Sequence, residues 1–156
     1  MPGRIDQRLA DLGIEIPSTP APQFNYVPVQ FSGHLAFVAG QVPMADGEIR
    51  YSGQVGIHLD LETGQAAARL CAINMLAQLK TALDGDLDRI VKVVRVGGFV
   101  SCGADFTAQG QVINGASDLL VEVLGDAGRH ARAAVGCSAL PLGAAVEVEG
   151  LFEVSD

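Results

Sequence analysis

Residues 131–150 read ARAAVGCSALPLGAAVEVEG, and they carry the clearest signal of the fold in this chain. Small and β-branched side chains dominate both halves of the segment, while Pro141 and Gly143 interrupt it in the middle. Proline and glycine favour turns, whereas valine and an alternating pattern favour strands. The pattern therefore predicts two β-strands, over residues 131–139 and 144–154, on either side of a short turn.

The side chains of the second strand fall into two sets, because successive residues of a strand point to opposite faces of a sheet. One set is apolar and suits a buried core: Ala144, Val146 and Val148. The other set contains two carboxylates: Glu147 and Glu149, together with Ala145. Charged groups are rarely buried without partners, so we expect the two glutamates on an open face of the sheet.

The first strand brings a cation into the same region. If the turn closes a regular hairpin, Arg132 lies opposite Leu151 and diagonal to Glu149. Alternation groups His130 with Arg132, so we expect the arginine, the histidine and both glutamates to share the open face. Two interpretations remain open. One is a structural Arg–Glu ion pair, and the other is a pocket in which Arg132 binds a substrate carboxylate while a glutamate positions water.

Periodicity predicts the remaining elements. Apolar residues at helical spacing predict a short helix and two long ones, over residues 4–12, 61–83 and 107–124. Alternating or β-branched runs predict strands over residues 26–31, 35–39 and 90–102, with a further hairpin at Asp46-Gly47. Three prolines predict an extended connector over residues 16–23. This order predicts a single α+β domain in which both long helices cover one face of one mixed sheet.

Composition limits the classes of function. The chain has 156 residues, enough for one compact domain. Its 10 basic and 18 acidic residues give a net charge of −8, which disfavours nucleic acid as a partner because a polyanion needs a run of cations. Hydrophobic residues make up 49% of the chain but aromatic residues only 5%, and we expect part of this apolar surface to close a subunit interface.

The cysteines and the N-terminus indicate which cellular compartment and which cofactors to expect. Cys71, Cys102 and Cys137 are odd in number and form no CxxC pair, which is typical of a reducing compartment rather than a disulfide framework or a zinc site. The N-terminus lacks the apolar core of a signal peptide, and no apolar run reaches membrane-spanning length. We therefore expect a cytoplasmic protein without membrane partners, and the absence of a dinucleotide, P-loop or metal motif predicts no cofactor.

Several separate motifs resemble one protein family. They are LAFVAGQVP at residues 35–43, the turn and strand at residues 85–100, ARAAV at residues 131–135, the Leu140-Pro141 turn and VEVE at residues 146–149. Together they resemble the Rid/YjgF family, also labelled endoribonuclease L-PSP, from about Tyr26 to the end. The resemblance implies a chorismate-mutase-like fold and a homotrimer with clefts between subunits. It divides the chain into an N-terminal helix and connector, residues 1–22, and a family domain, residues 23–156. The phrase VINGASD at residues 112–118 is similar to that of a divergent branch.

The resemblance also implies roles for individual residues. In deaminating members of the family, the residue matching Arg132 holds the substrate carboxylate, and the residue matching Glu147 orients the water that hydrolyses an enamine or imine. The matches to Tyr26 and to the backbone of Gly40 complete the pocket, with His130 and Glu149 as further cleft-lining candidates. This sequence departs from the family pattern at three positions. Ala39, Ala104 and Ala134 stand where the family has Ser, Asn and Cys, respectively.

Two functions remain open at this stage. Arg132 and Glu147 favour an enamine or imine hydrolase, a deaminase acting on small 2-aminoacrylate-like metabolites that bear a carboxylate. The three alanines remove polar groups that would orient a substrate, and they favour a non-catalytic trimer that binds a small molecule or a partner in the same cleft. Ribonuclease activity, the other label of the family, is disfavoured by the acidic charge.

Overall fold

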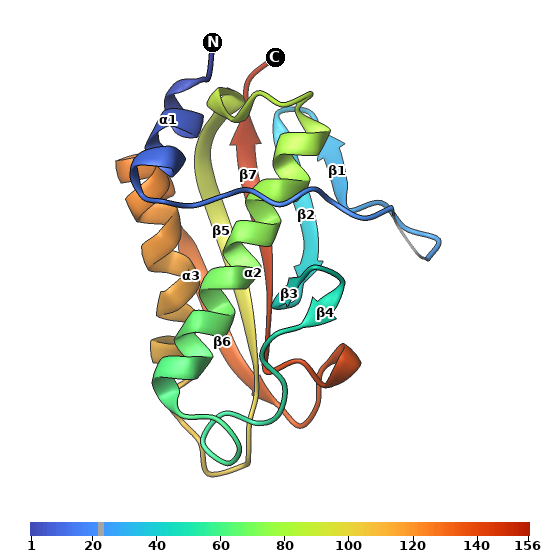
Figure 1. Ribbon diagram of the computed structural model, residues 1–156, viewed down its shortest axis with the longest axis vertical. Helices are drawn as coiled ribbons and strands as arrows, with labels where there is room; N and C mark the ends of the chain where they lie inside the picture. Colours follow the sequence, from blue (N-terminus) through green and yellow to red (C-terminus); the bar gives the residue numbers. More distant parts are fainter. Residues whose placement is uncertain (22–23) are drawn as a thin grey trace.

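The computed structural model describes residues 1–21 and 24–156, so residues 22 and 23, the end of the expected connector, lie outside the described part. Figure 1 shows helices on one side of a twisted sheet. The helices are α1 (Arg4–Asp11), α2 (Leu61–Ala82) and α3 (Gln109–Leu124). The strands are β1 (Val29–Ser32), β2 (Leu35–Gln41), β3 (Met44–Ala45), β4 (Glu48–Ile49), β5 (Ile90–Ser101), β6 (Ala131–Cys137) and β7 (Val146–Val154).

The sheet has the strand order β1-β2-β7-β5-β6, while β3 and β4 form the separate hairpin expected at Asp46-Gly47. Helices α2 and α3 lie against the same face of the sheet, and this side is toward the viewer in Figure 1. The prediction of an α+β fold with one mixed sheet and two long helices on one face is confirmed. The first strand begins at Val29, three residues later than predicted.

Strands β6 and β7 do not form the predicted hairpin. Strand β5 lies between them, parallel to β6 and antiparallel to β7. Arg132 therefore has Val96 as its neighbour, and Leu151 has Arg95. The physical reason is the crossover through α3, since a helix that connects two strands along one face makes them parallel and adjacent. This places β6 at the edge of the sheet and leaves β7 to insert between β5 and β2.

The helices are held against the sheet by close backbone contacts. Helix α2 begins at Asp60, whose carboxylate accepts a hydrogen bond from the Thr63 N–H at 2.8 Å and so caps the first turn. Gly98 of β5 lies directly under α3, where any Cβ would come within 2.6 Å of the Ile113 side chain. Gly98 therefore marks a close approach between β5 and α3.

Helix α1 belongs to the same core as the long helices. Its Ile5 and Leu9 are 0% and 2% exposed and lie in the hydrophobic cluster beneath α2 and α3. Asp88 fixes its start by accepting hydrogen bonds from the N–H groups of Arg4 and Ile5 at 2.7 and 2.8 Å, and these bonds lower the pKa of the Asp88 carboxyl. The first helix is thus packed onto the domain rather than standing apart from it.

In the part of the chain that the structure describes, none of the helices combines the length and apolarity needed to cross a membrane.

We predict that Gly115→Ala destabilises the protein, although alanine normally stabilises a helix relative to glycine. A Cβ at residue 115 would collide with the backbone carbonyl of Gln65 on α2 and come within 3.0 Å of its Cα. Forcing the two helices apart should cost about 1–3 kcal/mol of unfolding free energy, measured by urea denaturation. Gln111→Ala, an exposed change on the same helix, is the control, and it should leave the stability nearly unchanged.

Candidate functional site

Glu147 and Gly40 lie together on the open face of the sheet. Strand β2 contains a bulge between Val38 and Gln41, where the pairing with β7 shifts. Gly40 sits in this bulge with its backbone against the Glu147 carboxyl group, and a Cβ at residue 40 would lie 3.0 Å from the Glu147 Cδ. A Cβ here would displace the carboxyl group from its position, so two residues that the family resemblance places in the pocket are in contact.

The surroundings of Glu147 make its carboxyl group a better proton acceptor than an ordinary surface glutamate. The side chain is half-buried, and its neighbour along the same face of β7 is the carboxylate of Glu149. Burial first, and then the negative charge of Glu149, raise the pKa of Glu147. Within the described residues its carboxylate makes no hydrogen bond to the protein. A group in this state can exchange a proton with a bound water or substrate.

An ion pair on this face was missed by the sequence reasoning. Arg95 of β5 forms an ion pair with Glu149, with 3.7 Å between Nη1 and Oε1. Gly97 lies beside them, and its missing side chain leaves room for both charged groups. The pair borders a cavity of about 450 Å³ that also includes Phe37 and Leu151. The alternation of β5 could have identified Arg95, because it places Arg95, Gly97 and Phe99 on the face opposite Val96 and Val100.

Arg132 lies on the other side of the sheet, which contradicts the expectation that it shares the open face with the glutamates. Its guanidinium group reaches helix α3 and donates to Asn114 Oδ1 at 2.8 Å, Ser117 Oγ at 3.1 Å and the Gly110 carbonyl at 3.2 Å. His130 lies with it, since its Nε2 is 2.9 Å from the same Ser117 Oγ. The expectation failed because it depended on the hairpin between β6 and β7, which does not form.

The remaining predicted residues lie on separate segments of the chain. Tyr26 is 54% exposed in the segment before β1 and stacks on Phe24 with 6.4 Å between ring centroids. Of the three alanines that depart from the family pattern, Ala39 lies in the β2 bulge, Ala134 lies on β6 two residues from Arg132, and Ala104 follows β5 in an exposed loop. The predicted pocket role of Tyr26 stays a prediction.

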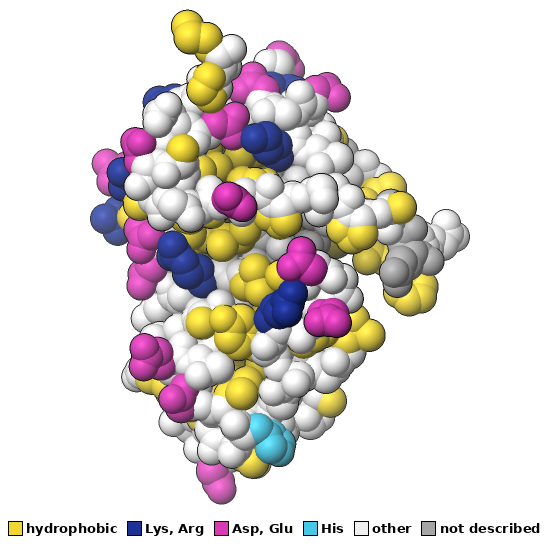
Figure 2. Space-filling view, viewed as in Figure 1, with side chains coloured by type: hydrophobic (Ala, Val, Ile, Leu, Met, Phe, Trp, Pro, Cys, Tyr) yellow, Lys and Arg dark blue, Asp and Glu magenta, His cyan; other side chains and the backbone are white. Residues whose placement is uncertain are grey.

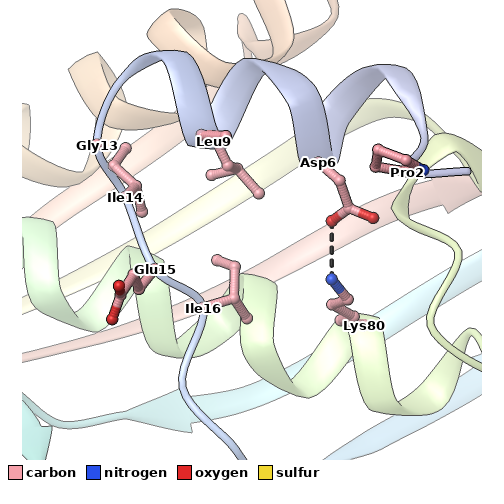
Figure 3. Close-up of a pocket in the computed structure, with 9 residues that line it drawn as sticks. Pro2, Asp6, Leu9, Gly13, Ile14, Glu15, Ile16 and Lys80 are labelled. Carbon is pink, nitrogen blue, oxygen red and sulfur yellow. Dashed lines mark hydrogen bonds and ion pairs between the residues drawn. The ribbon is translucent and has the colours of Figure 1, made fainter.

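A larger cavity, of about 580 Å³, lies away from these residues, between α1, the connector and α2. Figure 3 shows Asp6 and Lys80 pointing toward each other at one side of it, next to the apolar side chains of Leu9, Ile14 and Ile16. The Lys80 Nζ and Asp6 Oδ1 atoms are 2.8 Å apart. This ion pair fastens α1 to α2. Among the described residues no three side chains of the types that hold metals come together as a site.

The open face of the sheet carries apolar side chains that no helix covers. Phe37 of β2 is 46% exposed and Val135 of β6 is 48% exposed. Phe99 and Leu151, both half-buried, lie between them on the same face. A monomer rarely leaves such a surface open to water, because burying it against another protein surface is favourable.

Comparisons with known proteins agree with this architecture. The family model described as "YjgF/chorismate mutase-like, putative endoribonuclease" matches residues 6–153. Protein TCP17 of Trypanosoma cruzi is 47% identical over 155 residues, which cover 99% of this chain and 96% of that protein. The crystal structure of Atu1372, a protein of unknown function from Agrobacterium tumefaciens, superposes with a TM-score of 0.89 at 48% identity, over 96% of this chain and 91% of that chain.

A second solved structure, described as a "putative endoribonuclease" from Shewanella oneidensis, gives a TM-score of 0.93 at 34% identity and covers 97% of this chain and all of that chain, 100%. The family model spans nearly the whole chain, including the bulge at Gly40, the edge strand with Arg132 and the VEVE strand with Glu147. The chain therefore belongs to the YjgF/chorismate-mutase-like family, the Rid family that its motifs resemble.

Proposed function

We propose that this protein hydrolyses enamines or imines of small carboxylate-bearing metabolites, with 2-aminoacrylate as the type of substrate, in sites between the subunits of a homotrimer. The observation that carries the proposal is the half-buried Glu147 carboxyl group, whose pKa is raised and which lies against the backbone of Gly40. A carboxylate with raised proton affinity beside an open backbone position suits general base catalysis by way of water.

The chemistry requires one water molecule and one proton carrier. An enamine becomes an imine by tautomerisation, in which one proton adds to the carbon and one leaves the nitrogen. Glu147 then accepts a proton from water while the water oxygen bonds to the imine carbon, and the nitrogen takes up the proton to give a carbinolamine. The hydroxyl proton of the carbinolamine then passes to the nitrogen, the carbon–nitrogen bond breaks, and ammonia leaves while the hydroxyl oxygen becomes the carbonyl oxygen of a keto acid. A positioned general base of this kind contributes roughly 10²–10⁴ in rate.

The positions of Arg132 and Glu147 explain why two chains would be needed. The two side chains lie on opposite faces of the sheet, on strands that β5 separates. A pocket in which Arg132 holds the carboxylate and Glu147 activates water then combines Arg132 of one subunit with Glu147 and Gly40 of another. The apolar open face, with Phe37 and Val135 exposed, supports assembly through this side of the molecule.

The charge distribution supports a small anion over RNA as the ligand. The net charge is −8, and Figure 2 shows acidic and basic side chains interspersed over the helical side, without a basic stripe. A polyanion needs several neighbouring cations, whereas one carboxylate needs only one planar guanidinium group. Some relatives are described as endoribonucleases, but we do not propose ribonuclease activity for this chain.

The first prediction of the proposed function concerns assembly. Multi-angle light scattering at micromolar concentration should give the mass of three chains, because the open sheet face and the edge strand β6 both need a cover. Val135→Glu, which places a charge on the exposed apolar part of β6, should shift the population toward monomers. A monomeric mass for the unaltered protein would remove the proposed site along with the trimer.

The second prediction tests the shared site by subunit mixing. Arg132→Lys and Glu147→Gln should each lower the hydrolysis of freshly generated 2-aminoacrylate by at least tenfold, since the first loses the two-pronged grip and the second the base. When the two inactive variants are dissociated and reassembled together, some clefts contain one unaltered arginine and one unaltered glutamate. Activity measured as ammonia release should then return to a fraction of the unaltered level.

The matched control for mixing is each variant reassembled with itself, which should stay inactive. If mixed trimers stay inactive while both single variants are inactive, the two residues do not act across one interface. If the unaltered protein and both variants all match the uncatalysed rate, the hydrolase proposal fails, and the binding trimer favoured by the three alanines replaces it.

The third prediction concerns pH. Burial raises the pKa of Glu147 above its value in the unfolded chain, so ionisation of this group costs the native state stability. The cost is absent below the ordinary glutamate pKa and complete above the raised one. Glu147→Gln should therefore melt at a higher temperature than the unaltered protein near pH 8, and the difference should vanish as the pH falls below 4. Hydrolysis, which needs the carboxylate, should decline as the pH falls through the same window.

A further inference from the structure

The polar groups between α3 and β6 form one connected network. Arg132 donates from Nη1 to Asn114 Oδ1 at 2.8 Å and to Ser117 Oγ at 3.1 Å, and from Nη2 to the Gly110 carbonyl at 3.2 Å. Ser117 Oγ is also 2.9 Å from His130 Nε2, and His130 Nδ1 is 2.6 Å from the Gly128 carbonyl. Asn114 and Ser117 belong to the VINGASD phrase, for which the proposed chemistry gives no role.

With a neutral imidazole, the hydrogen atoms of this network have one consistent arrangement. The Gly128 carbonyl can only accept, so His130 carries its hydrogen on Nδ1. Arg132 can only donate, so Ser117 Oγ accepts from Nη1. The Ser117 hydroxyl hydrogen then points to the unprotonated Nε2 of His130. His130 thus orients Ser117, and Ser117 in turn receives one hydrogen of the guanidinium group.

The three acceptors occupy one edge of the guanidinium group. Residues 110, 114 and 117 lie along one face of a helix, at spacings of four and three. Their acceptors take the two Nη1 hydrogens and one Nη2 hydrogen, in order around the group. An arginine has five N–H donors, so Nε–H and the second Nη2 hydrogen remain. Among the described residues these two donors have no protein acceptor, and Arg132 is exposed.

We propose that Asn114, Ser117 and His130 are positioning residues, which hold one edge of Arg132 so that its Nε–Nη2 edge faces outward as a fixed two-donor fork for the substrate carboxylate. Two parallel N–H donors match the two oxygens of a carboxylate. A long side chain that is already held loses less rotamer entropy when it binds a ligand, so pre-positioning raises affinity without a new contact. The inference rests on the proposed function and names the residues that set carboxylate recognition in the same site.

Ala134 lies two residues along β6 on the same face as Arg132 and has no polar group to contact a ligand. Orientation of a carboxylate at this position would therefore depend on a rigid arginine. A merely structural role would instead use the same contacts to attach β6 to α3, and it would show as a loss of stability without any selectivity for charge.

The experiment compares two ligands that differ in charge. Pyruvate carries the carboxylate, and methyl pyruvate is the neutral ester of the same skeleton. Binding of each to the assembled protein is measured by titration calorimetry or ligand-observed NMR. We expect the unaltered protein to bind pyruvate more tightly than the ester. Ser117→Ala should weaken pyruvate binding by about tenfold, the order expected for one lost hydrogen bond to a charged group, and leave ester binding unchanged.

Conservative variants separate positioning from structure. Ser117→Thr and His130→Gln retain the hydroxyl and an acceptor, and both should recover most of the pyruvate affinity, whereas His130→Ala should not. Asn114→Asp keeps the shape but places a carboxylate against the guanidinium group, and this ion pair offsets the positive charge that a ligand would meet. It should weaken pyruvate binding about tenfold without lowering the melting temperature, so it remains informative if Ser117→Ala folds poorly. Ser18→Ala, an exposed serine of the connector, is the matched control and should change neither ligand.

Each outcome decides between the two proposals. If Ser117→Ala and Asn114→Asp bind pyruvate as tightly as the unaltered protein, or lose both ligands equally, the positioning role is wrong even when hydrolysis is observed. If the unaltered protein binds pyruvate no better than the ester, Arg132 grips no carboxylate and the positioning role is again wrong. If the selective loss is found but 2-aminoacrylate is not hydrolysed, the positioning role holds and the hydrolase proposal fails.

Discussion

Strand β7 pairs with β2 along one edge and with β5 along the other, and the arrangement of every other element depends on this double pairing. It satisfies the backbone hydrogen-bonding groups of a central strand on both sides, so the strand cannot shift without breaking two ladders. Its apolar residues Val146, Val148 and Phe152 are 0% exposed. Because side chains alternate, burying these three commits Glu147 and Glu149 to the open face.

The same insertion separates the two residues that carry the proposed chemistry. With β7 in the middle and β6 at the edge, Glu147 lies on the open face while Arg132 lies toward α3. One chain therefore offers two incomplete sites, a carboxyl group against Gly40 and a guanidinium group held by a helix. In the proposed trimer, neighbouring copies would bring the halves together, and burial of the uncovered apolar face would favour that assembly.

Small residues have a common physical role in this molecule. At Gly40 the missing side chain admits a carboxyl group, at Gly98 it admits helix α3, and at Gly115 it lets α2 and α3 approach backbone to backbone. None of these three glycines has a positive φ angle, so close approach rather than conformational freedom requires them. The low aromatic content of the chain, 5%, is consistent with layers that pack by proximity rather than by large side chains.

The sequence alone determined most of the elements and the alternation of side chains along β7. Both long helices, the hairpin at Asp46-Gly47 and the separation of Val146 and Val148 from the two glutamates were predicted correctly, because periodicity and turn residues act over a few neighbouring positions. The family motifs also pointed to Gly40 and Glu147, which lie in contact, and their roles in a pocket stay predictions. Only the tertiary structure decided that β5 lies between β6 and β7, that Arg132 faces α3, and that Arg95 pairs with Glu149. The choice of neighbouring strands depends on the crossover through α3 and on the burial of a whole strand. Both depend on many contacts between residues far apart in the chain, and no local sequence pattern contains this information.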